Sequence, residues 1–456
     1  MKPIAFPKKF SFGIAESDLQ TVGSILPQEQ EAAQQPMWEV FSQNKQADTP
    51  GYGSYKYQQY KKDVKLITEL GVKAYRTSIS MSRTITADGK PNKKAIKWYR
   101  NYLSSLKDKG LEIHLCLYHW EAPAEFLAEG ILDPKFEAYF LKHVKIVIEE
   151  VGDLVDYYIP INELWCISFL AYYIGIHAPG RKDIGEFFLA YFKSIELQTA
   201  VIKIIKELSP QAKIGIVNIH FPTYIQEENI ANPTYIKARE LADNITNFMY
   251  SDPFYFGSID KSVIKKFKKY FPTNFKDILR QAKLAEHIDY YGVNYYNSQY
   301  VEPTKDGLGF NQVIPEEALK NSLGWPVSLA PYYPDGLTDI LVTYTHRYQA
   351  QGLRNIVVSE NGTPTFADTV NNVPQDDFRI FFIYEHLKQV HQAIAKGACV
   401  TGYFLWTLLD NYEWQEGYKS GSAFGLVAVD KQTGARTPKK SYFWYQQFLN
   451  NLYKKS

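Results

Sequence analysis

Short runs of β-forming residues alternate with longer amphipathic stretches along almost the whole chain. Eight such runs recur, near residues 10–15, 73–80, 112–118, 155–161, 213–219, 288–294, 355–360 and 400–406. Between them, apolar residues three and four positions apart predict helices over 60–70, 98–109, 136–150, 187–208 and 381–396. Strands that alternate with helices pair in parallel, and eight such units close a (β/α)8 barrel. The pattern therefore predicts an α/β protein with a TIM-barrel fold.

Glycines mark the ends of several predicted helices. Gly71, Gly110, Gly352 and Gly397 each stand at the end of such a stretch, just before the next strand. Glycine is the usual stop at a helix C-terminus because it adopts a left-handed backbone without steric cost. These stops support the same alternation of helices and strands.

The organisation of the chain favours one domain with long loops. A guide of about 150 residues per domain suggests about three domains, but no linker or low-complexity segment divides the 456 residues. We therefore predict a single barrel domain over residues 1–456. The stretches after the first, fourth, fifth and sixth strands exceed what one helix requires, and in a barrel such segments surround the active site. A doubly wound open sheet is the alternative, although neither of the glycine motifs typical of it occurs.

Composition bears on the kind of partner. The 51 basic and 49 acidic residues nearly cancel, to a net charge of +2, which argues against nucleic acid or a membrane surface as a partner. Aromatic residues make up 15% of the chain, and such rings suit carbohydrates, whose faces are apolar and whose edges carry hydroxyls. The competing interpretation, that the tyrosines fill a large core, is equally compatible with the composition.

Cysteine usage and the apolar pattern bear on location. Cys116, Cys166 and Cys399 are an odd number, and two of them lie in apolar runs, so we expect buried reduced thiols rather than disulfides. The N-terminus shows no secretory signal, and no run of about 18 apolar residues predicts a membrane span. We therefore expect a cytoplasmic protein, and the sequence leaves open whether it forms a homo-oligomer.

Two predicted strands end in a glutamate beside an asparagine. Asn162-Glu163 follows the fourth run, and Glu360-Asn361 ends the seventh. Catalytic groups of a barrel lie at the C-terminal ends of its strands, so both carboxyl groups are expected to face one site. A glycosidase needs such a pair, one protonated to assist the leaving oxygen and one ionised to attack. The alternative for each glutamate alone is a structural ion pair with an arginine of the core.

Other strand ends supply groups that suit the same chemistry. Arg76 would hold the charge of an ionised carboxylate, and a tyrosine hydroxyl of the Asn294-Tyr295-Tyr296 segment would orient it. Trp406 would give the site an apolar floor, and Glu413 would accept hydrogen bonds from sugar hydroxyls. His119 alone is better explained as a core histidine. No HExxH, HxxxH or CxxC spacing occurs, so we expect no metal and no cofactor.

The same residues resemble glycoside hydrolase family 1, the β-glucosidase family, and the resemblance covers essentially the whole chain. The motifs that carry it are Phe10-Ser11-Phe12-Gly13 with Gln20, Arg76-Thr77-Ser78-Ile79-Ser80, His119-Trp120, Asn162-Glu163, Asn294-Tyr295-Tyr296, Ser359-Glu360-Asn361-Gly362, and the block from Gly402 to Trp414 with Glu416-Gly417-Tyr418 and Phe424-Gly425-Leu426. The block that starts at Gly402 is the longest and the most specific. The resemblance implies a β-glycosidase on a (β/α)8 barrel.

The resemblance also implies a mechanism. By it, Glu360 is the nucleophile and Glu163 the acid/base of an enzyme that retains the anomeric configuration through a covalent glycosyl-enzyme. Such a mechanism places the two carboxyl groups only about 5–5.5 Å apart, with no room for a water between them. The family's sugar pocket corresponds here to Gln20, His119, Asn162, Trp406, Glu413 and Trp414, with Asn162 on the 2-hydroxyl and Tyr296 hydrogen-bonded to Glu360.

Glu413 bears on the substrate. Family members that act on 6-phosphoglycosides usually have Ser at this position, followed shortly by Lys and Tyr, whereas a glutamate would repel a phosphate dianion. Lys419 after Tyr418 points the other way, but the negative charge of Glu413 outweighs it. The resemblance therefore implies β-glucosides without phosphate, with β-galactosides or β-fucosides as related substrates.

Several positions depart from the family pattern. Pro160 and Leu164 flank Asn162-Glu163 where the family has Thr and Pro, so the aim or the pKa of the acid/base is expected to differ. The other departures are Leu19, Val22, Thr77 and Met81. A substitution at a position that supports a binding residue can make the binding residue less well held, even when the binding residue itself matches the family.

The sequence leaves two other functions open. A transglycosidase would use the same site with an acceptor sugar or alcohol in place of water, and a catalytically weak sugar-binding protein would keep only the pocket. Hydrolysis or transfer depends on the loops around the aglycone, where Trp325 is expected as a stacking platform and Tyr172 and Tyr173 are weaker candidates. Both glutamates of the family's catalytic pair are present in this chain, which favours an enzyme, namely a retaining β-glycosidase.

Overall fold

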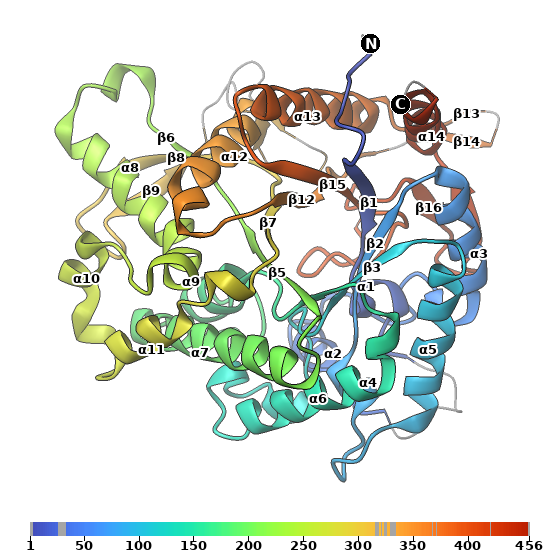
Figure 1. The fold of residues 1–456 in the computed structure, drawn as a ribbon, viewed down its shortest axis with the longest axis horizontal. Coiled ribbons are helices and arrows are strands. Elements are labelled where there is room, and N and C mark those ends of the chain that lie inside the picture. The colour runs from blue at the N-terminus through green and yellow to red at the C-terminus, as the bar shows by residue number, and fades with distance from the viewer. Residues whose placement is uncertain are drawn as a thin grey trace.

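The computed structural model describes residues 3–25, 33–314, 319–320, 322, 326–328, 334–366, 368–370, 372–419 and 421–454. In it, parallel strands close into a barrel that helices surround (Figure 1). The barrel strands are β1 (Ser11–Ala15), β2 (Ala74–Ser78), β3 (Glu112–Cys116), β4 (Tyr157–Ile159), β5 (Lys213–Ile219), β7 (Tyr290–Asn294), β12 (Ile356–Asn361) and β15 (Val400–Trp406). They follow one another around the barrel in chain order, and β15 pairs with β1. The predicted (β/α)8 barrel is confirmed.

The five predicted helices all occur, and four of them begin earlier than the apolar pattern indicates. They are α3 (Lys56–Leu70), α5 (Lys93–Lys107), α6 (Phe136–Val151), α7 (Ile184–Leu208) and α13 (Asp377–Ala395). The first turns of the four contain polar residues, which add nothing to an apolar period. Side-chain caps mark two of these starts, since Asn92 precedes α5 and Asp183 precedes α7, and each accepts a hydrogen bond from a first-turn amide.

The glycine stops are also confirmed. Gly71, Gly110, Gly352 and Gly397 have φ between 75° and 103°, the left-handed conformation that favours glycine at the end of a helix. Two further helices complete the outer layer, α12 (Asp335–Tyr348) and α14 (Lys440–Tyr453). Among the helices of the described residues, none combines the length and the apolar character needed to cross a bilayer.

Long insertions follow the strands at which the sequence predicts them. They hold α1 (Asp18–Val22) and α2 (Met37–Asn44) after β1, the π-helix η5 (Cys166–Ile174) after β4, β6 (Thr223–Tyr224), α8 (Pro233–Thr246), α9 (Asp252–Phe256), α10 (Lys261–Phe267) and α11 (Phe275–Ala282) after β5, and β8 (Gln299–Pro303) and β9 (Phe310–Val313) after β7. The insertion after β7 also holds β10 (Leu319–Lys320) and β11 (Pro326–Ser328). Short elements elsewhere include α4 (Met81–Thr84), β13 (Asp368–Val370), β14 (Val373–Gln375), β16 (Val427–Val429) and β17 (Arg436–Pro438). Strands β6, β8 and β9 form a small sheet that α8 contacts, to one side of the barrel (Figure 1).

Glycines in the barrel strands make room for aromatic rings that fill the interior. A Cβ added at Gly13 would lie 2.5 Å from the ring of Phe404, and one added at Gly215 would lie 2.1 Å from the ring of Tyr290. Both rings belong to a buried cluster of residues from all eight barrel strands. The barrel is therefore a packed core rather than a pore, and a site can form only at its ends.

Candidate active site

A cavity of about 370 Å³ lies at the C-terminal ends of the barrel strands. Seven of the predicted site residues line it: His119, Glu163, Tyr296, Glu360, Trp406, Glu413 and Trp414. They follow or end β3, β4, β7, β12 and β15, and the loop after β15 contributes the last two. The barrel therefore brings together, in one place, residues that are distributed over some 300 positions from 119 to 414 of the chain.

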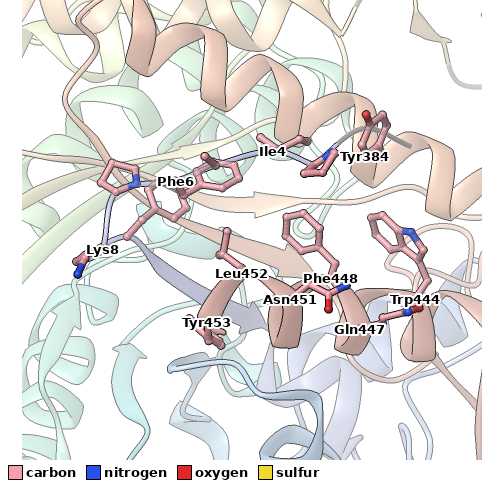
Figure 2. Close-up of a pocket in the computed structure, with 14 residues that line it drawn as sticks. Ile4, Phe6, Lys8, Tyr384, Trp444, Gln447, Phe448, Asn451, Leu452 and Tyr453 are labelled. Atoms are coloured by element: carbon pink, nitrogen blue, oxygen red, sulfur yellow. The ribbon is translucent and has the colours of Figure 1, made fainter. Parts of the chain in front are cut away.

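A second, larger groove of about 720 Å³ lies where the chain leads into β1 (Figure 2). Figure 2 shows the side chains of Trp444, Phe448 and Leu452 on α14 facing Ile4 and Phe6 of the N-terminal segment. Among the described residues that line this groove there is no aspartate or glutamate. It lies at the other end of β1 from the carboxyl pair, so the smaller cavity is the candidate active site.

Glu360 receives a hydrogen bond at each carboxyl oxygen. The guanidinium Nη1 of Arg76 donates to Oε1, and the Tyr296 hydroxyl donates to Oε2 over 2.6 Å. Burial has the largest single influence and would lower the pKa of Arg76, but the charge and the hydrogen bond of Glu360, together with Cys116 and Tyr290, raise it overall, so the guanidinium stays charged. A cation and a hydroxyl donor therefore hold the two carboxyl oxygens of Glu360 in place.

Glu163 has a different environment in the same cavity. The amide of Asn294 donates to Oε1 over 2.6 Å, and the thiol of Cys166 lies 3.0 Å from Oε2. Both partners are neutral, and the side chain is buried. Burial, and then the charge of Glu360, raise the pKa of Glu163 to about 8. Charged and hydroxyl donors on Glu360, and neutral donors together with a raised pKa on Glu163, suit the roles of a nucleophile and a proton donor.

Asn162 links the two carboxyl groups through its amide. Its Oδ1 accepts from Arg76 Nη2 over 2.5 Å and from Asn294 Nδ2 over 3.3 Å. Since Oδ1 faces these donors, Nδ2 must donate to His119 Nε2, 3.1 Å away. The pKa of His119 is well below its usual value because of burial and the charge of Arg76, so the ring is neutral with its proton on Nδ1.

The Nδ1 atom of His119 has no hydrogen-bond partner among the described residues. Because His119 lines the cavity, this N–H group can serve as a donor to a ligand. The ring stacks between two indoles, with its centroid 6.1 Å from that of Trp406 and 5.9 Å from that of Trp414. Trp120, which also lines the cavity, and Trp38 pack on Trp414 with ring centroids 4.6 Å and 4.7 Å away. These rings form an apolar wall with a polar edge, as a sugar requires.

Glu413 lies on the same wall with a raised pKa. Burial, followed by the charges of Glu416, Glu360 and Glu163, raises the pKa of Glu413 to about 8. In either protonation state the carboxyl group retains acceptor positions for hydroxyl groups.

Three predicted residues lie behind the cavity wall. Arg76, Asn162 and Gln20 are fully buried, and none is among the described residues that line the cavity. The amide of Gln20 has a partner at each end, since Oε1 accepts from the Ser17 hydroxyl over 2.6 Å and Nε2 donates to the Tyr412 carbonyl over 2.8 Å. These residues therefore hold others in place, and a sugar reaches Gln20 only if that amide changes partners.

The outer part of the cavity contains residues that the sequence did not single out. Its apolar members are Trp165, Leu170, Ile176, Ile219, Phe221 and Ile314, and its polar members include Asn297 and Gln312. Trp165 Nε1 and Asn297 Oδ1 are buried atoms without a partner in the described residues, and they offer one donor and one acceptor. Trp165 lies two positions after Glu163 in an apolar run, a signal that could have identified it, whereas the distant Phe221 carries none.

The sequence predicts three residues around the aglycone, and the described ones among them do not line the cavity. Trp325 lies outside the described residues. Tyr172 is buried, and its hydroxyl donates to the Glu129 carbonyl over 2.6 Å. Neither Tyr172 nor Tyr173 is among the described residues that line the cavity, because the Tyr172 side chain lies against Gly130 and the Tyr173 ring packs on Phe187 of α7.

The unusual Pro160 interrupts the strand just before the acid/base position. The pairing of β4 with β5 stops at Tyr158 and resumes at Asn162 opposite Val217. The amide of Asn162 donates to the Tyr118 carbonyl over 2.9 Å, and the amide of Glu163 donates to the Val217 carbonyl over 3.1 Å. The backbone at Glu163 is thus anchored on both sides although Pro160 donates no hydrogen bond. Leu164 fits by packing into the apolar core, where it is 1% exposed.

Known proteins resemble this chain over its whole length. The family model described as "Glycosyl hydrolase family 1" matches residues 2–453. "Beta-glucosidase A" of Thermotoga maritima is 31% identical over 458 residues, which cover 98% of both chains, and "Beta-glucosidase A" of Acetivibrio thermocellus is 30% identical over 470 residues, which cover 99% of both. The solved structure of a family 1 β-glucosidase from Thermotoga maritima matches with a TM-score of 0.90 at 29% identity, over 99% of both chains. A structure of that enzyme with deoxynojirimycin matches with a TM-score of 0.89 at 30% identity, over 98% of this chain and 99% of that one.

Proposed function

The chain belongs to glycosyl hydrolase family 1 and is a retaining β-glycosidase, and from this premise we propose that it releases the terminal glucose of unphosphorylated β-glucosides, with Glu360 as nucleophile and Glu163 as acid/base. One observation carries the assignment of roles. A cation and a hydroxyl hold Glu360, whereas among the described residues only neutral donors touch the buried Glu163, in the same cavity.

The environments of the two glutamates support a two-step reaction. In the first step a Glu360 oxygen bonds to the anomeric carbon while Glu163 gives its proton to the glycosidic oxygen, so that the aglycone leaves as an alcohol. In the second step Glu163 takes a proton from water, the water oxygen bonds to the anomeric carbon, and the bond to Glu360 breaks. Two inversions leave the configuration of the sugar unchanged.

The cavity wall supports a neutral sugar. His119, Trp406, Glu413 and Trp414 offer a donor, two ring surfaces and an acceptor. Relatives named β-glucosidases support glucose as the sugar. The apolar outer wall around Trp165 and Phe221 favours an aromatic or alkyl aglycone, and no feature of the described site favours transfer or binding alone over hydrolysis.

The charges in the cavity argue against a phosphorylated sugar. No lysine or arginine is among the described residues that line it. Burial lowers the pKa of both His119 and His177, so these rings supply no positive charge at neutral pH. Lys419 forms an ion pair with Glu416 over 2.8 Å. A phosphate dianion would therefore meet three carboxyl groups and no cation.

We also propose that the whole chain acts as one catalytic domain. The first barrel strand β1 pairs with the last, β15, so barrel closure needs both ends of the chain. Strands between them supply both glutamates.

We expect a covalent intermediate to accumulate with 2,4-dinitrophenyl 2-deoxy-2-fluoro-β-glucoside. The fluorine slows both steps, and the activated leaving group speeds only the first. Mass spectrometry of the intact protein should show the addition of one fluoroglucosyl group, and peptide analysis should place it on Glu360. A label on another residue, or no label on a protein that still binds glucose, would count against the proposed roles.

A kinetic comparison tests whether the enzyme discriminates against a phosphate group on the sugar. We expect 4-nitrophenyl β-glucoside to be hydrolysed with a kcat/KM about 100-fold or more above that of its 6-phosphate, because burying a phosphate dianion beside no compensating cation costs several kcal/mol. A preference for the 6-phosphate would contradict the argument from the cavity charges without affecting the roles of the glutamates.

A pH profile should report the raised pKa of Glu163. Its protonated form is the acid of the first step, and its pKa of about 8 keeps that form populated at neutral pH. We expect kcat/KM for an alkyl β-glucoside to fall about tenfold per pH unit as the pH rises above this value, since kcat/KM follows the free enzyme. A fall that begins near the usual pKa of a glutamate would show that burial and Glu360 do not raise it.

A further inference from the structure

The thiol of Cys166 touches the acid/base glutamate. Its Sγ lies 3.0 Å from Oε2 of Glu163, and only 2% of the residue is exposed. Cys166 is the first residue of η5, and its backbone amide donates to the Glu163 carbonyl over 3.0 Å. This backbone bond closes a turn between Glu163, whose φ is 52°, and the start of η5. The local fold therefore places the thiol against the carboxyl group at the cavity wall.

The direction of this hydrogen bond depends on which group keeps its proton. An ionised carboxylate can only accept. Burial, and then the charges of Glu163 and Glu360, raise the pKa of the Cys166 thiol well above its usual value, so the sulfur stays protonated. When Glu163 is ionised, the S–H group therefore donates to Oε2 while the Asn294 amide donates to Oε1.

Glu163 gives up a proton in the first step and accepts one in the second, and a weak hydrogen-bond donor allows both changes. A cation, such as Arg76 at Glu360, would favour the ionised form so strongly that little acid remained. Without any donor on Oε2, the ionised form would be less stable, and less of Glu163 would be ionised and ready to accept a proton in the second step. A thiol is a weak donor, so it supports the anion without excluding the acid.

Among the described residues, five titratable side chains act on the Glu163 carboxyl group through contact or charge. They are Cys166 on η5, Arg76 on β2, Glu360 on β12, and Tyr296 and Glu413 on the loops after β7 and β15. Of these, only Cys166 makes a hydrogen bond with the Glu163 carboxyl group among the described residues, and Asn294 provides the other bond.

We propose that Cys166 is a positioning residue for Glu163, whose thiol holds Oε2 in place and stabilises the ionised carboxylate that accepts a proton from water. The inference rests on the proposed function for the role of Glu163, but the hydrogen bond itself can be tested without turnover. Cys166→Ala removes the donor, and Cys166→Ser replaces it with a hydroxyl donor.

The experiment is a ¹³C NMR titration of enzyme labelled at the glutamate carboxyl carbons, with the Glu163 signal identified by its loss in Glu163→Gln. We expect Cys166→Ala to raise the midpoint of this titration by about 0.5–1 pH unit, because a hydrogen bond to the charged form is lost. Cys166→Ser should leave the midpoint unchanged or lower it. The basic limb of kcat/KM for an alkyl β-glucoside should move with the midpoint in both variants.

Cys399→Ala is the matched control, because its thiol lies 3.6 Å from the Thr345 hydroxyl and makes no contact with a carboxyl group among the described residues. Cys399→Ala should change neither the midpoint of the Glu163 titration nor the basic limb of kcat/KM. Equal midpoints in wild type, Cys166→Ala and Cys166→Ser, even with a lower melting temperature for Cys166→Ala, would reduce Cys166 to a packing residue. An equal rise in both variants would also overturn the proposal. If the midpoint moves as expected but the limb does not, Cys166 supports Glu163 and the proposed acid/base role fails instead.

Discussion

Replacing Glu360 with alanine should abolish turnover, with kcat for aryl β-glucosides lower by about 10⁴-fold or more, the scale seen when a nucleophile is removed. The reason is that no other described carboxyl group occupies the place beside Arg76 and Tyr296. Without the carboxylate no glycosyl-enzyme forms. Stopped assays with 2,4-dinitrophenyl β-glucoside measure the loss, and circular dichroism checks that the variant is folded.

Added azide should distinguish a missing nucleophile from a damaged site. In Glu360→Ala, azide can enter the space left by the carboxyl group, bond to the anomeric carbon and expel the phenolate, giving the α-glucosyl azide with inverted configuration. A matched control is Glu112→Ala, since Glu112 contacts His114 at the opposite end of β3 over 2.9 Å. This variant should keep its activity within a few-fold. Full activity in Glu360→Ala would contradict the assignment of the nucleophile.

Glu163→Gln should have the second largest effect, and the effect should depend on the leaving group. We expect kcat/KM for alkyl β-glucosides to fall by about 10²–10⁴-fold, the range for loss of a general acid. For 2,4-dinitrophenyl β-glucoside the fall in kcat/KM should be small, because this phenolate leaves without a proton. The amide keeps the size of the carboxyl group, so the Asn294 and Cys166 contacts change little in distance.

A series of aryl β-glucosides with leaving groups of increasing pKa gives the measurement. The plot of log kcat/KM against leaving-group pKa should be steeper for Glu163→Gln than for wild type. The pH limb near 8 should also disappear, because the group that titrates there is gone. Hydrolysis of an alkyl β-glucoside at the wild-type rate would show that another residue donates the proton.

Local patterns of the sequence were enough to find the barrel. Eight β-rich runs fall on the eight barrel strands, and the glycines that stop the helices have the backbone conformation expected of them. The errors lie at helix starts, because caps such as Asn92 and Asp183 act through one hydrogen bond and leave no apolar period. Glu163 and Glu360 were singled out in the same way, since each stands at the end of a predicted strand.

The sequence by itself determined the strands, the helices and the two carboxyl groups that end up in one cavity, because these follow from residues close together in the chain. Only the tertiary structure decided which side chains reach the cavity and which stand behind it. Arg76 was expected to hold a carboxylate, but only the closed barrel places it behind the cavity wall on Glu360, 284 positions away in the chain, whereas Phe221 of the outer wall is invisible to a local pattern. The raised pKa of Glu163 has the same origin, because burial and the nearby Glu360 exist only after the barrel closes and brings distant strand ends together.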